Sequence, residues 1–567
     1  MRIAFLLSIV SLLIISCTSK PTADQIYING TIYTVDENKP QVEAVAVTNE
    51  RIVFVGNETE ALKWKGEDTE VIDLKGKTMT PGFIESHGHL MGLGYSELNL
   101  NLMDVKSYEE MVDRVKDAVG KVSPGEWILG RGWHQSKWDS LPEKIVGGFQ
   151  THELLSAVSP DNPVYLSHAS GHAAMANAKA MEIAGVNQLS VENFNEIVVK
   201  GGEVFRDELG NPTGVFNETA QQLIRKHIPD NTPERDRMAL ELAIKACHRN
   251  GITSFHDAGV GENTISLYKE FLKEGKLSVR NYVMITGRDQ ELVHEWLDKG
   301  VYIDSSHWLT IRSIKLNCDG ALGSRGAWLL EEYSDMPGQH GHETLPMEVV
   351  SEISEKALKS GFQVCSHAIG DRANQEILDR YESAFNNNSD LSGNHRFRIE
   401  HAQHLNPDDI PRFGELGVIA AMQAIHMSSD RPWAIDRLGK KRIEEGAYMW
   451  QELLNTGAKV INGTDVPVEP VNPIASFYAS VTRKTLKGEP DGGYESAQRM
   501  TREQALKSYT LDAAYGEFGE MIKGSIEVGK LADFTVFSQD IMTIDEKDLL
   551  KTVVDMTIVG GNTVYIR

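Results

Sequence analysis

The sequence predicts an α/β protein: a parallel (β/α)8 barrel of the TIM-like metal-hydrolase type, with a small composite β-sandwich domain built from both chain ends. Eight apolar, strand-like runs alternate with helical patterns along the middle of the chain, which indicates a barrel. Short β-branched runs around glycine turns lie at both ends of the chain. With 567 residues and 41% hydrophobic residues, the chain can form a large core, which excludes a disordered protein.

The N-terminal segment has the features of an export signal. The apolar run Ile3–Ile15 is shorter than the ~20 residues that a membrane-spanning helix needs. It leads into Ile-Ile-Ser-Cys17, which resembles a bacterial lipobox. We therefore expect a lipoprotein signal peptide over 1–17, a tether over 18–25, and a protein exported to the bacterial cell envelope and anchored in a lipid bilayer through acylated Cys17. The alternative is a cysteine that follows a signal peptide by chance.

The next segment predicts β structure. Ala44–Val47 and Ile52–Gly56 are β-branched runs joined by a short polar turn, the pattern of a hairpin. Neither chain end has enough strands to form a sandwich alone. We therefore expect 26–80 and 524–567 to pair into one composite β-sandwich.

Residues 81–523 are predicted to form the barrel. The stretch of about 95–250 is too long for one βα unit, so we expect an inserted subdomain there. Capping-box spacings predict that helices begin at Ser107 and Thr501. The predicted barrel strands are Met79–Ser86, Gly251–Phe255, Arg280–Ile285, Ile311–Leu316, Phe362–Ser366, Phe397–Glu400, Val418–Met422 and Lys459–Asn462.

Histidines, a lysine and an aspartate follow or close several of these runs, at the barrel face where active sites form. His87 and His89 are two residues apart in a strand, so their side chains share one face. Imidazole and carboxylate groups suit Zn²⁺ or another divalent ion, and burying them without a metal costs several kcal/mol. The candidate ligands of one or two ions are His87, His89, Lys315, His367, His401 and Asp465.

Lys315 allows two interpretations. A charged ammonium group is repelled by a dication and is costly to bury. As a neutral amine it can react with CO₂ to form a carbamate, and this carboxylated lysine would bridge two metal ions. The alternative is an unmodified lysine that pairs with Asp319 or Asp371.

The motifs of the chain resemble those of the amidohydrolase superfamily, in the branch that includes N-substituted formamide deformylases. The resemblance covers nearly everything after Asp24 and implies an amidohydrolase that acts on carbon–nitrogen bonds other than peptide bonds. The motifs that carry it are Thr80–His89, Ser170–His172, Gly214–Glu218, Asp319–Arg325, Ser366–Asp371, Ile399–Gln403 and Gly524–Phe534.

The expected reaction is the hydrolysis of a small-molecule C–N bond, in a substituted amide or formamide, with a divalent ion that activates water and polarises the carbonyl. Asp465 is the expected catalytic residue, accepting the water proton and passing it to the leaving nitrogen. His87 and His89 would hold one ion and His367 and His401 the other, with Lys315 between them. An unmodified Lys315 would favour a single ion.

Five further residues are candidates for substrate binding: His172, Trp133, Arg325, Gln423 and His426. Trp133 and His172 belong to the insert, which could cover the barrel mouth, although Trp133 could equally be packing. For Arg325 a salt bridge within the barrel is the alternative to a contact with substrate.

Two other functions remain open. One is a deaminase of a nitrogen heterocycle; in the same superfamily such an enzyme usually needs one metal and no lysine at the position of Lys315, on the fourth predicted strand. The other is an inactive, anchored binding protein, which would have a broken ligand set. The net charge of −24 argues against a nucleic-acid partner. The expected partner is a small-molecule substrate. The sequence leaves the oligomeric state open, including a homo-oligomer.

Overall fold

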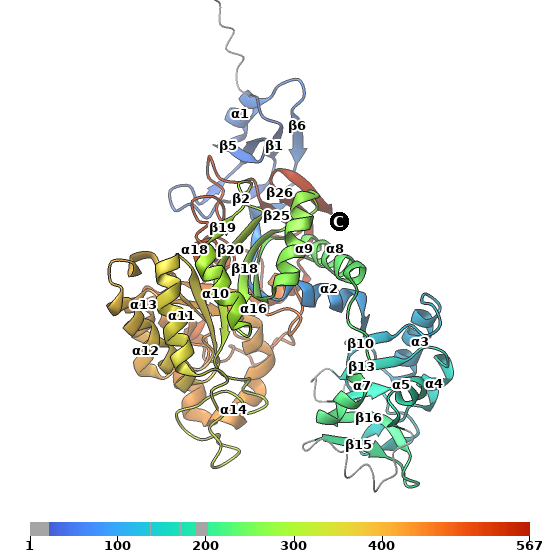
Figure 1. Cartoon of the computed structure of the whole chain (residues 1–567). Coiled ribbons are helices and arrows are strands. Elements are labelled where there is room, and N and C mark those ends of the chain that lie inside the picture. Colours follow the sequence, from blue (N-terminus) through green and yellow to red (C-terminus); the bar gives the residue numbers. More distant parts are fainter. Residues whose placement is uncertain (1–21, 136–137, 169–172, 187–201) are drawn as a thin grey trace, which may run out of the picture.

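The computed structural model shows a barrel with a subdomain beside it and two small sheets at one end (Figure 1). The expected signal peptide, including Cys17, lies outside the described residues, and so does His172. The described residues are 22–135, 138–168, 173–186 and 202–567.

Eight parallel strands follow one another around the barrel in chain order. They are β8 (Phe83–Gly88), β17 (Ile252–Val260), β18 (Arg280–Thr286), β20 (Leu309–Asn317), β21 (Gln363–Ala368), β22 (Arg398–His401), β23 (Ile419–Met422) and β24 (Val460–Asn462). Backbone hydrogen bonds link the two ends of this sheet: Asp465 donates to His87 O at 2.7 Å, and His89 donates to Val466 O at 2.8 Å. The prediction of an eight-stranded parallel barrel is confirmed, and the barrel is nearly closed.

The first predicted strand, Met79–Ser86, is wrong in its extent because this run forms two strands. β7 (Thr78–Pro81) belongs to a small sheet, and the barrel strand β8 begins at Phe83. Gly82 lies between them, where an added Cβ would come within 2.3 Å of the Thr253 side chain. The chain therefore passes from one sheet to the other at a position that has room only for glycine.

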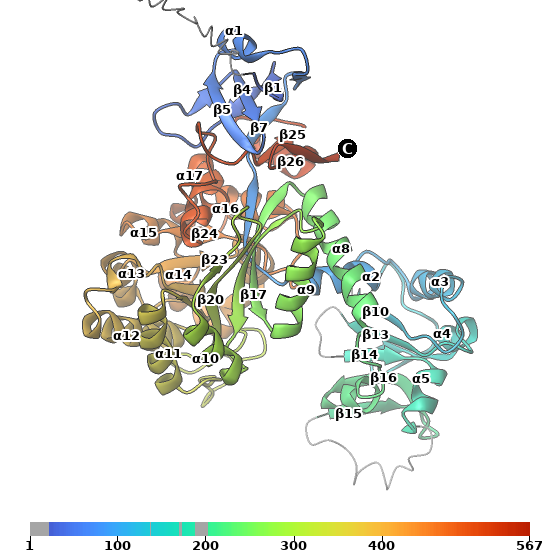
Figure 2. The ribbon, with the colours of Figure 1, turned by 45° about the horizontal axis from the view of Figure 1, so that its top comes forward.

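Helices between the strands cover the outside of the barrel (Figure 2). They include α9 (Glu262–Lys273), α10 (Gln290–Lys299), α11 (Met347–Ser360), α12 (Asp371–Asn387), α13 (Ile410–Leu416), α14 (Ala424–Gly446) and α16 (Pro473–Thr482). Their apolar faces join the main hydrophobic core, as Val293 and Trp296 of α10 do. The capping box predicted at Thr501 is present at the start of α17 (Arg502–Ser508). Across the described ranges, no helix combines the length and apolarity that a bilayer-spanning segment requires.

The insert forms a subdomain with its own six-stranded sheet and lies beside the barrel in both views (Figures 1 and 2). Its strands are β9 (Leu100–Asn101), β10 (Ile128–Trp133), β13 (Val164–His168), β14 (Ala173–Ala176), β15 (Gly202–Arg206) and β16 (Pro212–Glu218). Helix α3 (Tyr108–Val119) begins where predicted, since the Ser107 hydroxyl accepts the backbone N–H of Glu110 at 3.1 Å. Helices α2 (Leu90–Leu98) and α8 (Pro233–Arg249) join the insert to the barrel and pack against each other.

Strands from both chain ends meet in one sheet. β7 and β25 (Phe534–Phe537) pair antiparallel at its centre, flanked by β26 (Val554–Val559) and β27 (Asn562–Ile566) on one side and by β2 (Thr31–Tyr33) and β3 (Gln41–Val42) on the other. A separate four-stranded sheet contains β1 (Gln25–Ile28), β4 (Ala44–Thr48), β5 (Arg51–Gly56) and β6 (Glu70–Asp73).

The predicted hairpin is present as the antiparallel pair β4 and β5. Side chains of both small sheets meet in one hydrophobic cluster, to which Tyr27 and Val45 contribute from one sheet and Met79 and Phe534 from the other. The chain ends are therefore held together by strand pairing and by apolar packing.

Candidate metal centre and active site

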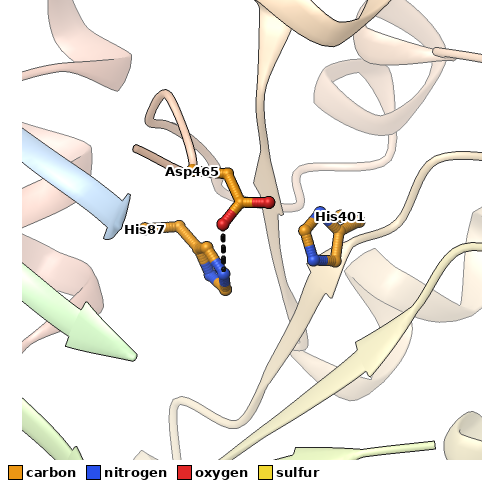
Figure 3. Close-up of side chains that lie close together, drawn as sticks. All are labelled: His87, His401 and Asp465. Carbon is orange, nitrogen blue, oxygen red and sulfur yellow. Dashed lines mark ion pairs between the residues drawn. The ribbon is translucent and has the colours of Figure 1, made fainter. Parts of the chain in front are cut away.

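Three side chains from distant parts of the chain meet at the carboxyl ends of the barrel strands (Figure 3). His87 lies on β8, His401 ends β22, and Asp465 follows β24. One nitrogen or oxygen atom of each residue lies within 4.8 Å of those of the other two, and all three residues are buried. The fold thus brings together three of the six predicted ligands at the barrel face where active sites form.

His87 and His89 both direct Nε2 toward Asp465. Nδ1 of His87 contacts a carboxylate oxygen of Glu400, and Nδ1 of His89 lies 2.8 Å from the carbonyl oxygen of Ala258. These oxygens can only accept hydrogen bonds, so Nδ1 carries the proton and Nε2 presents its lone pair. The two Nε2 atoms lie 3.6 Å and 3.2 Å, respectively, from Oδ1 of Asp465.

His401 is oriented in the same way by an amide side chain. Its Nδ1 lies 2.6 Å from Oε1 of Gln423. The amide is held in that orientation because its Nε2 donates to the carbonyl oxygen of Ala421 at 3.1 Å. Nδ1 of His401 is therefore the donor, which leaves Nε2 free for a ligand; metal-binding histidines usually have such a supporting acceptor.

His367 lies beside His401, and their ring centroids are 4.4 Å apart. Its Nε2 is 3.4 Å from Oδ1 of Asp319 and is buried without a hydrogen bond among the described residues. Asp319 itself accepts the backbone N–H groups of Ile369 and Gly370 at 3.0 Å and 2.8 Å. Asp319 thus holds the loop that follows His367.

Lys315 lies in the barrel interior next to the histidines. It is 3% exposed, and its Nζ is 3.3 Å from Nε2 of His87. Burial lowers the pKa of Lys315, which favours the neutral amine. Among the described residues, neither Asp319 nor Asp371 forms an ion pair with Lys315, so the structure does not place it in the alternative pairing.

The donor set fits a divalent cation. Nε2 of His89 and Oδ1 of Asp465 face each other as two electron-rich atoms, so a cation or a proton must lie between them. Burial acts to lower the pKa of His89, but the Asp465 carboxylate raises this pKa above its usual value. Burial acts to raise the pKa of Asp465, but His89 and the neighbouring imidazoles lower it well below its usual range. A bound ion would take the place of the shared proton.

Backbone strain also marks this site. His401 has a φ of 75° and Asp465 a φ of 56°, in the left-handed region that non-glycine residues seldom adopt. Each such residue costs on the order of 1–3 kcal/mol, and strain of this kind is concentrated at functional sites.

Two buried carboxylates at the site are not among the predicted residues. Glu400 contacts His87 and is held by Arg398, which donates to both carboxylate oxygens at 2.7 Å and 2.9 Å. Glu85 accepts the backbone N–H and the hydroxyl of Thr464 at 2.7 Å and 2.8 Å, and burial raises its pKa to about 8. Their spacing in the sequence could have indicated both residues. Glu85 lies two residues before His87 and Glu400 two residues after Arg398, so each shares with that residue the strand face that points into the barrel.

The structure places three predicted substrate-binding residues in other roles. Trp133 is fully buried in the core of the insert and donates through Nε1 to Leu166 O at 2.9 Å, which supports the packing alternative. Arg325 forms an ion pair with Asp335 at 2.8 Å, the salt-bridge alternative. Gln423 orients His401, as described above.

His426 remains beside the site. It is 8% exposed, its ring centroid is 6.0 Å from that of His401, and its Nε2 makes no hydrogen bond among the described residues. Its role in substrate binding stays a prediction.

Comparison with known proteins agrees with this geometry. Residues 70–565 match the model of the amidohydrolase family. The chain is 35% identical to Protein LONG AFTER FAR-RED 3 of Arabidopsis thaliana, over 96% of this chain and 92% of that protein. It is 27% identical to the N-substituted formamide deformylase of Arthrobacter pascens, over 96% of this chain and 98% of that enzyme.

A solved structure is similar over nearly the whole chain. It is an uncharacterized metal-dependent hydrolase from Pyrococcus furiosus, with a TM-score of 0.73 and 31% sequence identity, and the match covers 92% of this chain and 100% of that one. The resemblance stated from the motifs is confirmed. The chain belongs to the amidohydrolase family and is a hydrolase that acts on carbon–nitrogen bonds.

Proposed function

We propose that the protein is a metal-dependent hydrolase of small substituted amides or formamides and that Zn²⁺ is its metal. The observation that carries this proposal is the common orientation of His87, His89 and His401, whose supported rings leave Nε2 free around Asp465. The formamide deformylase among its relatives supports the substrate class. A bound divalent ion would lower the pKa of water toward neutrality and polarise the scissile carbonyl.

Asp465 is the proposed general base and acid. Its carboxylate stays ionised, because His89 and the other imidazoles lower its pKa against the effect of burial, so it can accept a proton from the attacking water. It then delivers that proton to the leaving nitrogen, which is a poor leaving group until protonated. The imidazoles of His87, His89, His367 and His401 would hold the metal.

Lys315 is proposed to be carboxylated. Its neutral amine would attack CO₂, forming an N–C bond and releasing one proton to solvent. The resulting carbamate anion would place an anionic oxygen ligand beside His87 and would allow two ions to bind. The position of Nζ, 3.3 Å from Nε2 of His87, supports this proposal.

The proposed activity is tested by assaying formamides, N-acyl amino acids and cyclic imides for release of amine, before and after removal of metal by a chelator. The expected result is metal-dependent turnover of at least one open-chain amide class, restored by adding Zn²⁺. Ammonia release from nitrogen heterocycles alone would favour the deaminase. If the protein binds a substrate analogue and turns over none of the compounds, it would be a binding protein.

We further propose that the protein is exported, that Cys17 is acylated and anchors it in a bilayer, and that the two small sheets form a sandwich. The shared hydrophobic cluster supports the sandwich, and the lipobox-like sequence supports the anchor. Labelling of growing cells with a radioactive fatty acid tests the anchor. The wild type should incorporate label and Cys17→Ala should not; equal labelling of both would refute it. No nucleic-acid partner is proposed, and a homo-oligomer is left to a measurement of mass in solution.

A further inference from the structure

A line of charged and polar side chains runs through the barrel interior, where branched aliphatic side chains usually form the packing layers. It begins at His87, whose Nδ1 contacts Glu400. Arg398 donates to Glu400 through Nε and Nη2, and its Nη1 donates to Nδ1 of His256 on β17 at 3.0 Å. Arg398, Glu400 and His256 are all 0% exposed.

The line continues toward the opposite end of the barrel. Because Nδ1 of His256 accepts from Arg398, its proton is on Nε2, which faces Oε1 of Glu517 at 3.4 Å, an ion-pair distance at which neither atom completes a hydrogen bond among the described residues. Lys523 forms an ion pair with Glu517 at 2.8 Å and donates to the Ser254 hydroxyl at 2.8 Å. Glu517 and Lys523 line a cavity of about 110 Å³ near the amino-terminal end of β20.

Charges alternate along this line. With neutral histidines, Glu400 and Glu517 are anionic, and Arg398 and Lys523 are cationic, so the four charges balance. Isolated buried ions are strongly destabilising, and a well-packed apolar core is often as stable as buried ion pairs. Stability alone therefore does not explain why these groups occupy the barrel interior.

We propose that Glu517 and Lys523 are positioning residues of the metal centre, acting through His256, Arg398 and Glu400 on His87. The inference rests on the proposed metal-dependent function. Glu400 fixes the ring of His87 with Nε2 toward Asp465, where the proposed ion would bind, and Arg398 holds Glu400 in place. His256 accepts from Arg398 and so limits where its guanidinium group can lie, and the Glu517 carboxylate, paired with Lys523, would attract the Nε2 proton of His256 across 3.4 Å. A change at the far end of the barrel would therefore loosen a metal ligand.

The test measures the dissociation constant for Zn²⁺ of the full-length protein, by competition with a chromogenic chelator. Loss of a partner that supports a metal-bound histidine typically lowers affinity by about 10–100-fold, so Glu400→Gln should raise the constant by that factor. Lys523→Met should raise it by roughly 2- to 30-fold, the range for changes along a coupled network. Lys523→Arg keeps the positive charge and should stay within about twofold of the wild type.

Arg280→Met is the matched control. Arg280 is a buried cation on β18 that pairs with Asp533 at 2.8 Å, and among the described residues no hydrogen bond or ion pair joins its guanidinium group to His256, Glu517 or Lys523. The Arg280→Met variant should have a lower melting temperature than the wild type and the same Zn²⁺ dissociation constant. This result would separate an effect on the position of a metal ligand from a general loss of stability. If Lys523→Met does not fold, Glu517→Gln replaces it with the same expectation.

The outcomes separate the two proposals. If the wild type binds Zn²⁺, Glu400→Gln weakens binding, and Lys523→Met and Glu517→Gln match the wild type, the positioning role is overturned and the metal site stands. If Arg280→Met weakens binding as much as Lys523→Met does, the positioning role is likewise overturned. If the wild type binds no divalent ion, the proposed function itself fails, and this inference fails with it.

Discussion

Nε2 of His89 and Oδ1 of Asp465 lie 3.2 Å apart, and both atoms present lone pairs to the space between them. Nδ1 of His89 uses its proton on the Ala258 carbonyl oxygen, so Nε2 has none of its own to donate to the carboxylate. A proton or a cation must therefore lie between them, and with a bound cation Asp465 would be placed both to contact that cation and to accept a proton from water.

Asp465→Asn should abolish most of the activity. The amide has nearly the shape of the carboxylate, but it cannot take up the water proton. General acid–base catalysis contributes about 10²–10⁴-fold, so kcat should fall by at least roughly that factor. Steady-state kinetics on the best substrate of the screen measure the effect, with circular dichroism as the control for folding. A variant that keeps a tenth of the wild-type kcat would exclude Asp465 as the catalytic base.

Lys315→Ala should reduce the metal content. If the carbamate bridges two ions, about two ions per chain in the wild type should fall to one or fewer in the variant. Atomic emission spectrometry of purified protein counts the ions. One ion in both proteins would contradict the bridge and would favour a single-ion site with an unmodified lysine.

Gln423→Leu should weaken metal binding, because it removes the acceptor that holds Nδ1 of His401. The expected loss of affinity is about 10–100-fold. A residue that only contacts substrate would instead raise KM and leave the Zn²⁺ dissociation constant unchanged. Measuring both constants on the same preparation distinguishes these roles, and Gln423→Glu, which retains an acceptor oxygen, serves as the matched control.

Acid should destabilise the protein partly through His395. This imidazole stacks on Phe385, accepts the backbone N–H of Phe397 at Nδ1 and donates from Nε2 to Leu416 O. Burial lowers its pKa from 6.5 to about 4. Between these values the unfolded chain binds more protons than the folded one, so stability is lost as the pH falls from 6.5 toward 4.

At pH 4.5 the expected loss from His395 is about 2–3 kcal/mol. His395→Gln keeps a donor and an acceptor but does not titrate. Its urea-unfolding midpoint should therefore fall less than that of the wild type between pH 7 and pH 4.5. If the urea-unfolding midpoint falls by the same amount in both proteins between pH 7 and pH 4.5, His395 does not titrate in this way.

The barrel and the convergence of His87, His401 and Asp465 could be predicted because local patterns determine them. Apolar runs separated by helical patterns predict strands, and residues that end parallel strands meet at one face. The spacing of His87 and His89 predicts a shared side of the strand. These inferences need only residues that are near one another in the sequence.

Contacts between distant residues could not be predicted in this way. That Gln423 would accept from His401 depends on how the neighbouring strands β22 and β23 align. That Glu400 would support His87 depends on two side chains from β22 and β8, which are not neighbours in the sheet. Arg325 was ambiguous because its partner, Asp335, lies in an irregular loop whose path the sequence does not reveal. The predicted first strand, Met79–Ser86, is divided into two strands at Gly82, and this division depends on the side chain of Thr253, which lies on another strand.

The most direct test is anomalous X-ray diffraction at the zinc edge on crystals grown with Zn²⁺. We predict at least one peak about 2.0–2.2 Å from the Nε2 atoms of His87 and His89 and from a carboxylate oxygen of Asp465. A second peak near His367 and His401 would support two ions. Crystals that contain Zn²⁺ in solution and show no peak among these residues would contradict the metal centre and, with it, the proposed hydrolysis.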